Sequence, residues 1–209
     1  MRSFALIGSG ISHSRSPELY RSRFGKDCGF SLLDSEDFLK AWQEFLEGPY
    51  TAANITAPFK GEAARVCASD PRNFISAEVS ETEATNLIIK EYGRLKAYNT
   101  DCLGVRRLLS GLEGVRRTVV IGGGGAGRAA LWACRSLGLE TSLKHHDALG
   151  RVESDLIVYT LPCRVECTLE CKYLLEANYK NPCFEGHPGY ISGLEWLRAQ
   201  AEEGFKIIK

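Results

Sequence analysis

Hydrophobic positions along the chain follow two spacings, one typical of strands and one typical of helices. Apolar runs that end at glycine or a small polar residue predict strands at 4–8, 52–56 and 118–121. In EDFLKAWQEFLEG the apolar residues recur at helical spacing, which predicts a helix that Ser35 caps and Gly48-Pro49 ends. The same reasoning predicts strands at 31–33, 83–90, 94–98, 140–143 and 155–160, and helices at 17–25, 58–68, 101–111 and 194–207.

Strands therefore alternate with helices along the chain. This order is typical of the α/β class with largely parallel sheets. We expect a domain boundary near residue 102, and we expect the last helix to return to the first domain. The 26 basic and 26 acidic residues balance, so nothing in the composition indicates a nucleic-acid or membrane partner.

Two further features bear on location and metal content. No stretch approaches about 18 apolar residues, and the first apolar run is too short for a signal peptide, which favours the cytoplasm. Of the eight cysteines, Cys163, Cys167 and Cys171 are spaced four apart and Cys183 follows. Four thiolates can hold zinc, but no Cys-x-x-Cys pair is present. Reduced cysteines that pack as small hydrophobes, with no bound metal, are the favoured interpretation.

A glycine-rich loop follows the strand at 118–121 and precedes an amphipathic helix. Gly122, Gly124 and Gly127 fit the pattern G-x-G-x-x-G, in which the glycines allow a tight turn, approach of a pyrophosphate, and close helix packing. The start of the helix adds free N–H groups and a positive dipole end. The alternative is a glycine-rich connection that binds nothing. After the next strand the chain reads KHHD, whose basic residues suit a 2′-phosphate, while Asp147 leaves a ribose 2′-hydroxyl open.

Five separated stretches resemble motifs of the shikimate dehydrogenase family, and they occur in the family's order. They are GSGISHSRSPELY (8–20), NITAPFK (54–60), EATNLIIKEYGRLKAYNTDCLG (83–104), GGGGAGRAA (122–130) and SGLEWLRAQAEEGF (192–205). The resemblance implies reversible, NADPH-dependent reduction of 3-dehydroshikimate to shikimate, in aromatic amino-acid (chorismate) biosynthesis. It implies an N-terminal α/β substrate domain at 1–101, a Rossmann-like NADP-binding domain at 102–189, and a C-terminal helix at 190–209 that packs on the substrate domain.

The resemblance also implies the site residues. Lys60 and Asp101 would be the catalytic pair, in which the lysine ammonium protonates the new alkoxide and the carboxylate orients it. The implied substrate-binding residues are Ser14, Ser16, Asn54, Thr56, Asn86, Tyr179 and Gln200. The implied cofactor-binding residues are Gly122, Gly124, Gly125, Ala126, Gly127, Arg128, Lys144, His145, His146 and Gly193. Structural alternatives remain for several: Ser16 and Asp101 are good helix caps, and the two histidines suit an exposed surface.

The chain departs from the family pattern in several places. Only residues 148–154 lie between Asp147 and the predicted strand that begins at Asp155, whereas a parallel crossover needs a dozen or more residues, so we expect a trimmed nucleotide domain. His145-His146-Asp147 replaces the family's Asn-Arg-Thr segment, which leaves NAD open as the cofactor. Trp196 replaces a methionine, Leu87 replaces a threonine, and the chain ends soon after Phe205, so we expect the family's last helix to be absent.

Two other functions remain open at this stage. One is a quinate/shikimate dehydrogenase that uses NAD, and the other is a non-catalytic shikimate-binding protein with a reduced cofactor domain. The pair Lys60 and Asp101 argues against the second, because a binding protein needs no proton donor. We expect a monomer or a homodimer with a small-molecule substrate.

Overall fold

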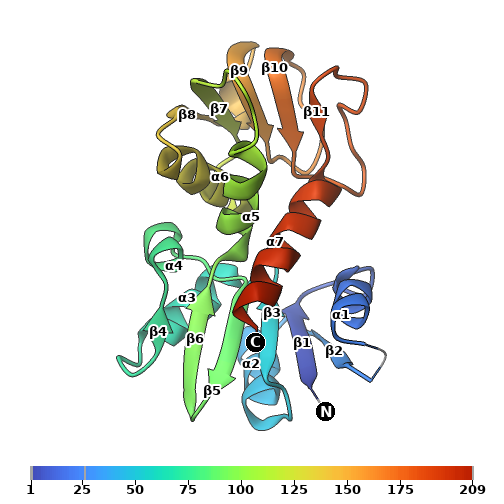
Figure 1. Ribbon diagram of the computed structural model, residues 1–209, viewed down its shortest axis with the longest axis vertical. Coiled ribbons are helices and arrows are strands. Elements are labelled where there is room, and N and C mark those ends of the chain that lie inside the picture. Colours follow the sequence, from blue (N-terminus) through green and yellow to red (C-terminus); the bar gives the residue numbers. More distant parts are fainter. Residues whose placement is uncertain (1, 26, 209) are drawn as a thin grey trace. The chain divides into compact units, whose positions relative to one another are not determined.

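The computed structural model describes residues 2–25 and 27–208, and it divides into two compact units (Figure 1). The first unit holds the described residues up to Thr100 together with those from Gly204 onward, and the second unit is Asp101–Glu203. The C-terminal helix therefore begins in the second unit and ends in the first. Among the described residues, no helix has the length and apolar character needed to cross a membrane.

A mixed six-stranded sheet forms the centre of the first unit. Its strands, in sheet order, are β2 (Gly29–Asp34), β1 (Ser3–Gly8), β3 (Ala52–Ile55), β5 (Leu87–Glu91), β6 (Arg94–Tyr98) and β4 (Phe74–Ile75). The strands β1, β2 and β3 are parallel, while β5 is antiparallel to both β3 and β6. The carboxyl ends of β1, β2, β3 and β6 therefore share one edge of the sheet with the start of β5.

Helices cover both faces of this first sheet. On one face the strand residues pack against α2 (Phe38–Glu47), α3 (Lys60–Ala68) and α4 (Ala77–Thr82). On the other face they pack against α1 (Ser16–Phe24) and the end of the C-terminal helix. Because side chains alternate along a strand, neighbours such as Phe4 and Ala5 belong to the two different cores.

Two predicted helix caps are wrong. The helix α2 begins at Phe38, and Asp37 is its cap: the Asp37 carboxylate accepts hydrogen bonds from the N–H groups of Leu39 (2.9 Å) and Lys40 (3.3 Å). The Ser35 hydroxyl instead accepts the N–H of Asp37. A carboxylate that directly precedes the first helical turn reaches two orphan N–H groups, which a residue further back cannot do.

Ser16 is likewise no cap, because it is the first residue of α1. The preceding residue, Arg15, makes no side-chain cap, and the N–H of Ser16 donates to the hydroxyl of Ser14 (3.2 Å). The motif serines therefore interact with each other at the start of the helix.

Several predicted boundaries also differ from the structure. The predicted strand at 83–90 begins only at Leu87, because residues 77–82 form α4 and Glu83 has a left-handed backbone with φ of 50°. The helix expected from Pro58 begins at Lys60, and the strand expected from Asp155 begins at Arg151. The short strands β4 and β11 (Tyr190–Ile191), the longer β10 (Thr168–Glu176) and α4 were not predicted.

The second unit is built on an entirely parallel sheet, as a Rossmann-like domain requires. Its five strands, in sheet order, are β11, β10, β9 (Arg151–Tyr159), β7 (Arg117–Ile121) and β8 (Glu140–Lys144). The helices of this unit are α5 (Thr100–Leu109), α6 (Gly125–Ser136), α7 (Gly193–Ile207) and the 3₁₀ helix η1 (His146–Ala148). The predicted α/β class, with a Rossmann-like domain and a C-terminal helix that returns to the first domain, is confirmed.

The two faces of this second sheet are covered differently. On one face Val120, Leu156 and Val158 pack against residues of α5, α6 and α7. On the other face the strand side chains pack against residues from loops, including Leu149 and Phe184. The crossover from β8 to β9 consists of residues 145–150 with η1 and no α-helix, which agrees with the short link read from the sequence.

Candidate active site

Three segments that carry predicted site residues meet at one edge of the first sheet. The segments after β1 and β3 lie there because parallel strands end at the same edge. Leu87, at the start of β5, pairs with Asn54 of β3 and with Tyr98 at the end of β6. The residues just before β5 and just after β6 therefore lie at this edge too, and the fold places six predicted residues there: Ser14, Ser16, Asn54, Thr56, Lys60 and Asn86.

The loop that carries the two serines is held by Asp34, at the end of β2. Its two carboxylate oxygens accept the N–H groups of Gly10 (2.8 Å) and Ile11 (3.1 Å). The hydroxyls of Ser14 and Ser16 lie 3.2 Å apart, and both side chains are half-buried. Asp34 is not among the predicted site residues, although an acidic residue that directly ends a strand is a signal for such a role.

Asn54 and Thr56 stand at the carboxyl end of β3. The side-chain amide of Asn54 donates to the backbone carbonyl of Asn86 (3.2 Å). Burial raises the pKa of the Tyr20 hydroxyl, an effect that its hydrogen bond with Asn54 opposes. Thr56 donates its N–H to the carbonyl of Ile7 (2.9 Å), which fixes it beside the end of β1.

Lys60 is the first residue of α3 and is half-buried. Its carbonyl accepts the N–H of Thr85 (3.0 Å), so the start of α3 is joined to the segment that carries Asn86. The turn around Pro58 separates β3 from this helix, and Thr56 closes the turn by accepting the N–H of Phe59 (3.0 Å). Backbone hydrogen bonds thus place Lys60 beside the same strand ends as Asn54 and Asn86.

Asn86 is buried and connects three strand ends. Its backbone bonds to Tyr98 (3.1 Å) and Ile55 (2.9 Å). Its side-chain oxygen accepts the N–H of Thr100 (2.7 Å), and its amide donates to the Thr100 hydroxyl (3.0 Å). Because Thr100 is the first residue of α5, Asn86 fixes the point at which that helix begins and from which Asp101 follows.

In the second unit, Asp101 and Gln200 lie on two helices in close contact. Asp101 occupies the first turn of α5, and Gly104 follows one turn later. A Cβ on Gly104 would lie 2.6 Å from the backbone nitrogen of Gln200, so only glycine lets α5 and α7 approach this closely. Gln200 is buried, and Arg107 further along α5 pairs with Glu202 on α7.

The glycine loop of the second unit has the geometry that the sequence motif requires. Gly122 has φ of 103°, a conformation that favours glycine. A Cβ on Gly127 would lie 1.8 Å from the carbonyl oxygen of Gly122, so α6 touches the loop backbone there. Around Gly124 no atom lies within 4 Å of such a Cβ, which leaves that side of the loop open. The hydroxyl of Thr160, after β9, donates to the carbonyl of Ile121 (2.8 Å) and braces the loop.

The remaining predicted cofactor residues surround this loop. Gly125, Ala126 and Arg128 belong to the first turns of α6, whose N–H groups are those a phosphate would use. Lys144 ends β8 and accepts the N–H of Gly122 with its carbonyl (2.9 Å). The His145 ring lies against the loop, 3.0 Å from the Cβ position of Gly123, and His146 is exposed.

Gly193 and Tyr179 lie at the end of β10. A Cβ on Gly193 would lie 2.5 Å from the carbonyl oxygen of Ala177, so α7 begins in contact with that strand end. Because the sheet is parallel, this end shares its edge with the glycine loop. Tyr179 is half-buried in the loop that follows β10.

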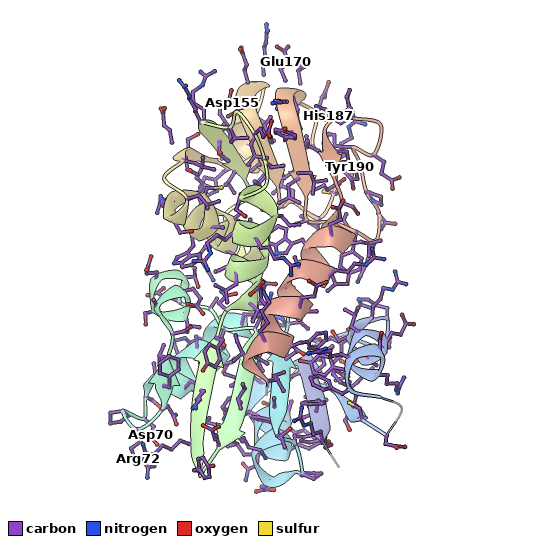
Figure 2. The ribbon with its side chains drawn as sticks, in the orientation of Figure 1. Asp70, Arg72, Asp155, Glu170, His187 and Tyr190 are labelled. Atoms are coloured by element: carbon purple, nitrogen blue, oxygen red, sulfur yellow. The ribbon has the colours of Figure 1, made fainter. Side chains whose placement is uncertain are left out.

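The loop after β10 is held by Glu176, which is fully buried. Its carboxylate accepts the N–H groups of Cys183 (2.8 Å) and Phe184 (3.3 Å) and the hydroxyl of Tyr190 (3.1 Å), a residue that is labelled in Figure 2. Burial, together with the Glu176 charge, raises the pKa of Tyr190 to about 12. Glu176 is not among the predicted site residues. The sequence marks it only as a charged residue at the end of an apolar strand.

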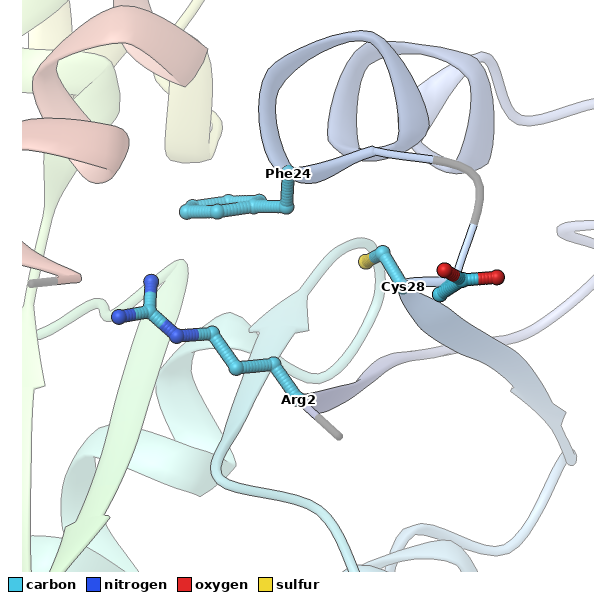
Figure 3. A pocket seen from close by; sticks show the side chains of 4 residues that line it. Arg2, Phe24 and Cys28 are labelled. Atoms are coloured by element: carbon cyan, nitrogen blue, oxygen red, sulfur yellow. The ribbon is translucent and has the colours of Figure 1, made fainter.

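A pocket of about 430 Å³ opens elsewhere in the first unit (Figure 3). The Arg2 guanidinium lies 5.5 Å from the centre of the Phe24 ring on its wall, and Cys28 lies beside them. The described residues that line this pocket include none of the predicted site residues.

Known proteins with a similar sequence include shikimate dehydrogenases. No family model matches the chain. The NADP-dependent shikimate dehydrogenase of Helicobacter pylori is 33% identical over 159 residues, which is 72% of this chain and 57% of that protein. The enzyme of the same name from Caldicellulosiruptor saccharolyticus is 33% identical over 166 residues, which is 74% of this chain and 57% of that protein. The chain thus spans about 57% of the length of these curated relatives.

Solved structures agree in fold. Shikimate dehydrogenase from Thermotoga maritima superposes with a TM-score of 0.80 at 22% identity, over 99% of this chain and 93% of that one. The enzyme from Thermus thermophilus, solved in complex with NADP(H) and shikimate, gives a TM-score of 0.81 at 22% identity over the same shares. Over most of the length of this chain, a third of the aligned residues are identical to those of curated shikimate dehydrogenases. The chain therefore belongs to the shikimate dehydrogenase family.

Proposed function

We propose that this protein is an NADP-dependent shikimate dehydrogenase, which reversibly reduces 3-dehydroshikimate to shikimate in aromatic amino-acid biosynthesis. The observation that carries the proposal is the convergence of Ser14, Ser16, Asn54, Thr56, Lys60 and Asn86 at one sheet edge of the first unit. The curated relatives bear this activity in their names, and the Thermus neighbour holds NADP(H) and shikimate. We assign substrate binding to residues 1–101, nucleotide binding to 102–189, and the helix at 190–209 to the first domain.

The polar groups at this edge match the chemistry of a hydroxylated ring carboxylate. The two serine hydroxyls, 3.2 Å apart, offer two donors to a carboxylate at the start of α1, where the helix dipole favours negative charge. Asn54, Thr56 and Asn86 offer amide and hydroxyl groups to the ring hydroxyls. We assign Tyr179 and Gln200 to the same substrate from the second unit.

Lys60 is the group we assign to proton transfer. NADPH, when bound, supplies the hydride that reduces the ketone carbon. The Lys60 ammonium then donates a proton to the carbonyl oxygen as negative charge develops on it, and the reverse reaction returns the proton to the amine. Asp101 is the carboxylate we assign to orient this ammonium, and Asn86 fixes the start of its helix.

The second unit fits the cofactor. The open side of Gly124 leaves room for a pyrophosphate at the first turn of α6, where Gly125 and Ala126 present backbone N–H groups. We assign Gly122, which shapes the turn, and Arg128, which follows in the helix, to the same cofactor site. We assign Lys144, His145 and His146 to the 2′-phosphate and Gly193 to the nicotinamide side. Asp147 is the residue that would suit the 2′-hydroxyl of NAD instead.

The first test is the change in nicotinamide absorbance when purified protein is mixed with shikimate and either NADP or NAD. We expect turnover with NADP and a clear preference for it over NAD. A preference for NAD would favour the quinate/shikimate dehydrogenase alternative. Titration of shikimate by calorimetry separates the third possibility, because binding without turnover on either cofactor would indicate a non-catalytic binding protein.

One observation favours that third possibility enough to keep it in the test. The crossover from β8 to β9 lacks the helix that would cover the adenine side of the sheet.

We place the protein in the cytoplasm as a monomer or homodimer. The balanced charge supports a small-molecule substrate over nucleic acid.

A further inference from the structure

The proposed function uses none of the cysteines, and they fall into two groups. None of the eight cysteines, all of which are described, forms a disulfide, and Cys28, Cys67, Cys102 and Cys134 are buried. Burial raises the pKa of Cys67 and of Cys134 to about 12, which makes both poor nucleophiles. In the loops and strand beyond β9, by contrast, Cys163 is exposed and Cys167, Cys171 and Cys183 are half-buried.

Two of these thiols stand on neighbouring loops. Cys163 belongs to the loop after β9, and Cys183 belongs to the loop after β10. The side-chain amide of Asn178 joins the loops, because it donates to the carbonyl of Pro162 and to the carbonyl of Asn181, each at 2.9 Å. The Cys183 sulfur lies 3.6 Å from that same Asn181 carbonyl. A short chain of contacts thus runs from the Cys183 thiol to the peptide group that precedes Cys163.

A second contact aligns the loops one residue further on. The Arg164 guanidinium lies over the Phe184 ring, 5.2 Å from its centre. Each of these residues directly follows one of the two cysteines, so the cation–π pair brings the two cysteine positions into register. The Phe184 ring also packs edge-on against Tyr159 with centroids 4.8 Å apart, and the Tyr159 hydroxyl donates to the carbonyl of Cys163 (2.8 Å).

The cysteines beyond β9 are not arranged as a metal site. Within residues 2–25 and 27–208, no group of three or more His, Cys, Asp and Glu side chains is placed to hold a metal ion. Burial and the Glu176 carboxylate raise the pKa of the Cys183 thiol, while Arg164 opposes this effect. An exposed thiol beside a second, less exposed one is the arrangement typical of a redox-sensitive pair.

We propose that Cys163 and Cys183 form a disulfide when the protein meets a peroxide. The Cys163 thiolate attacks the O–O bond of hydrogen peroxide, which yields a sulfenic acid and releases water. The Cys183 thiol then attacks that sulfur, forms the S–S bond and displaces a second water molecule. Two thiols are oxidised and one peroxide is reduced to two waters, so the step needs no other reactant.

The cross-link would tie together the loops that cover the helix-free face of the second sheet. Phe184 and Leu161 belong to that covering layer, and Thr160, at the start of the first loop, braces the glycine loop. Because a disulfide restricts the unfolded chain, oxidation should raise the melting temperature by roughly 5 °C or more. Dithiothreitol should reverse the change.

The test treats the purified protein with hydrogen peroxide, blocks remaining thiols with N-ethylmaleimide, and maps the tryptic peptides by mass spectrometry. Trypsin cleaves after Arg164, Lys172 and Lys180, so Cys163 and Cys183 fall on separate peptides and Cys167 falls on neither. We expect one linked species that joins residues 152–164 to residues 181–198, at the mass of the two peptides less two hydrogens.

Three serine variants complete the experiment. Cys163→Ser and Cys183→Ser should each abolish the linked species and the rise in melting temperature. Cys167→Ser, in the same loop as Cys163, should leave both unchanged. A link between Cys163 and Cys167, a link between two chains, or a Cys183 that remains reduced after Cys163 is oxidised would overturn the proposal.

Discussion

The two sheets of this protein position their candidate sites by different means. At the edge of the first sheet, six polar side chains from three segments converge, and helices cover both faces behind them. At the edge of the second sheet, the loop from Gly122 to Gly127 presents main-chain groups, and one face of the sheet packs, among the residues that the structure describes, against loop residues. Side-chain chemistry therefore defines the first site and main-chain geometry defines the second. We therefore expect the first site to lose activity when a functional side chain is removed. We expect the second to lose stability or nucleotide affinity when a methyl group is added to a glycine.

The largest effect should come from the lysine of the first unit. Lys60→Met keeps the length of the side chain but removes the ammonium, so the alkoxide loses its proton donor. We expect kcat to fall by about 10³-fold, within the range typical of general acid catalysis, with a much smaller change in KM for shikimate. Steady-state rates of NADPH formation measure both constants.

Lys40→Met is the matched control, because Lys40 is exposed on α2 of the same unit. Its rates should equal those of the unchanged protein. If Lys60→Met retained kcat within about threefold, the assignment of proton transfer to this residue would be wrong.

The second unit should respond to added methyl groups, and two glycines separate folding from binding. Gly127→Ala places a Cβ 1.8 Å from the Gly122 carbonyl oxygen, so we expect the free energy of unfolding to fall by about 3 kcal/mol. Gly124→Ala meets no atom within 4 Å, and φ of −71° suits alanine, so its stability should change by less than about 0.5 kcal/mol. Urea unfolding measures both.

Nucleotide binding then gives the opposite contrast for Gly124→Ala. Its methyl group would occupy the open side of the loop, so we expect calorimetry to show NADP affinity at least about tenfold weaker in a stable protein. Unchanged affinity in this variant would mean that the pyrophosphate does not approach Gly124.

A smaller effect should come from the buried carboxylate that holds the covering loop of the second unit. Glu176→Gln keeps the shape but leaves one amide oxygen to accept what two carboxylate oxygens now accept from Cys183, Phe184 and Tyr190. We expect the free energy of unfolding to fall by about 2 kcal/mol.

Glu170→Gln is the control on the same strand. Glu170 is exposed and pairs with Arg151 at the surface (Figure 2), so its loss should cost less than about 0.5 kcal/mol in the same urea measurement. Equal losses in the two variants would show that Glu176 does not hold the loop.

Much of the fold was predictable because the long elements have local signals. The apolar run before Gly122 and the helical spacing in α2 are sufficient in themselves. β10 was missed because Glu170 and Lys172 interrupt its apolar residues on the exposed side, and α4 was missed because six residues show too little of a helical period. The predicted cap of α2, Ser35, was wrong because the Asp37 carboxylate lies nearer to the start of the helix and caps it instead.

Candidate site residues could be selected from the sequence where a motif carries them, but their structural setting could not. Ser14, Lys60 and Asn86 lie in motifs that can be read locally. Asp34 and Glu176 hold loops whose N–H groups come from segments that only the tertiary fold brings near. The role of such a residue depends on long-range contacts, which composition and periodicity do not contain.

The smallest expected effect compares an aspartate in each unit. The Asp155 carboxylate, labelled in Figure 2, accepts the N–H groups of Arg117 (2.8 Å) and Arg116 (3.0 Å), which hold its pKa below its ordinary value and tie β9 to the start of β7. Asp70 accepts hydrogen bonds from Arg72 within its own turn, which lowers its pKa to about 2. Both carboxylates are ionised more readily in the folded protein, so their contribution is complete above about pH 4 and is lost as the pH falls through the folded pKa.

Asp155→Asn and Asp70→Asn should therefore each lower the melting temperature by roughly 1 °C at pH 7, and the difference from the unchanged protein should shrink steadily as the pH falls from about 4 to 2. Thermal unfolding at half-unit steps from pH 2 to pH 7, at low salt, measures this. We expect the larger shift for Asp155→Asn, because its contacts join two strands that are far apart in the chain, whereas those of Asp70 stay within one turn. A difference that did not shrink by pH 2 would show that the carboxylate shape, and not its charge, is what these contacts require.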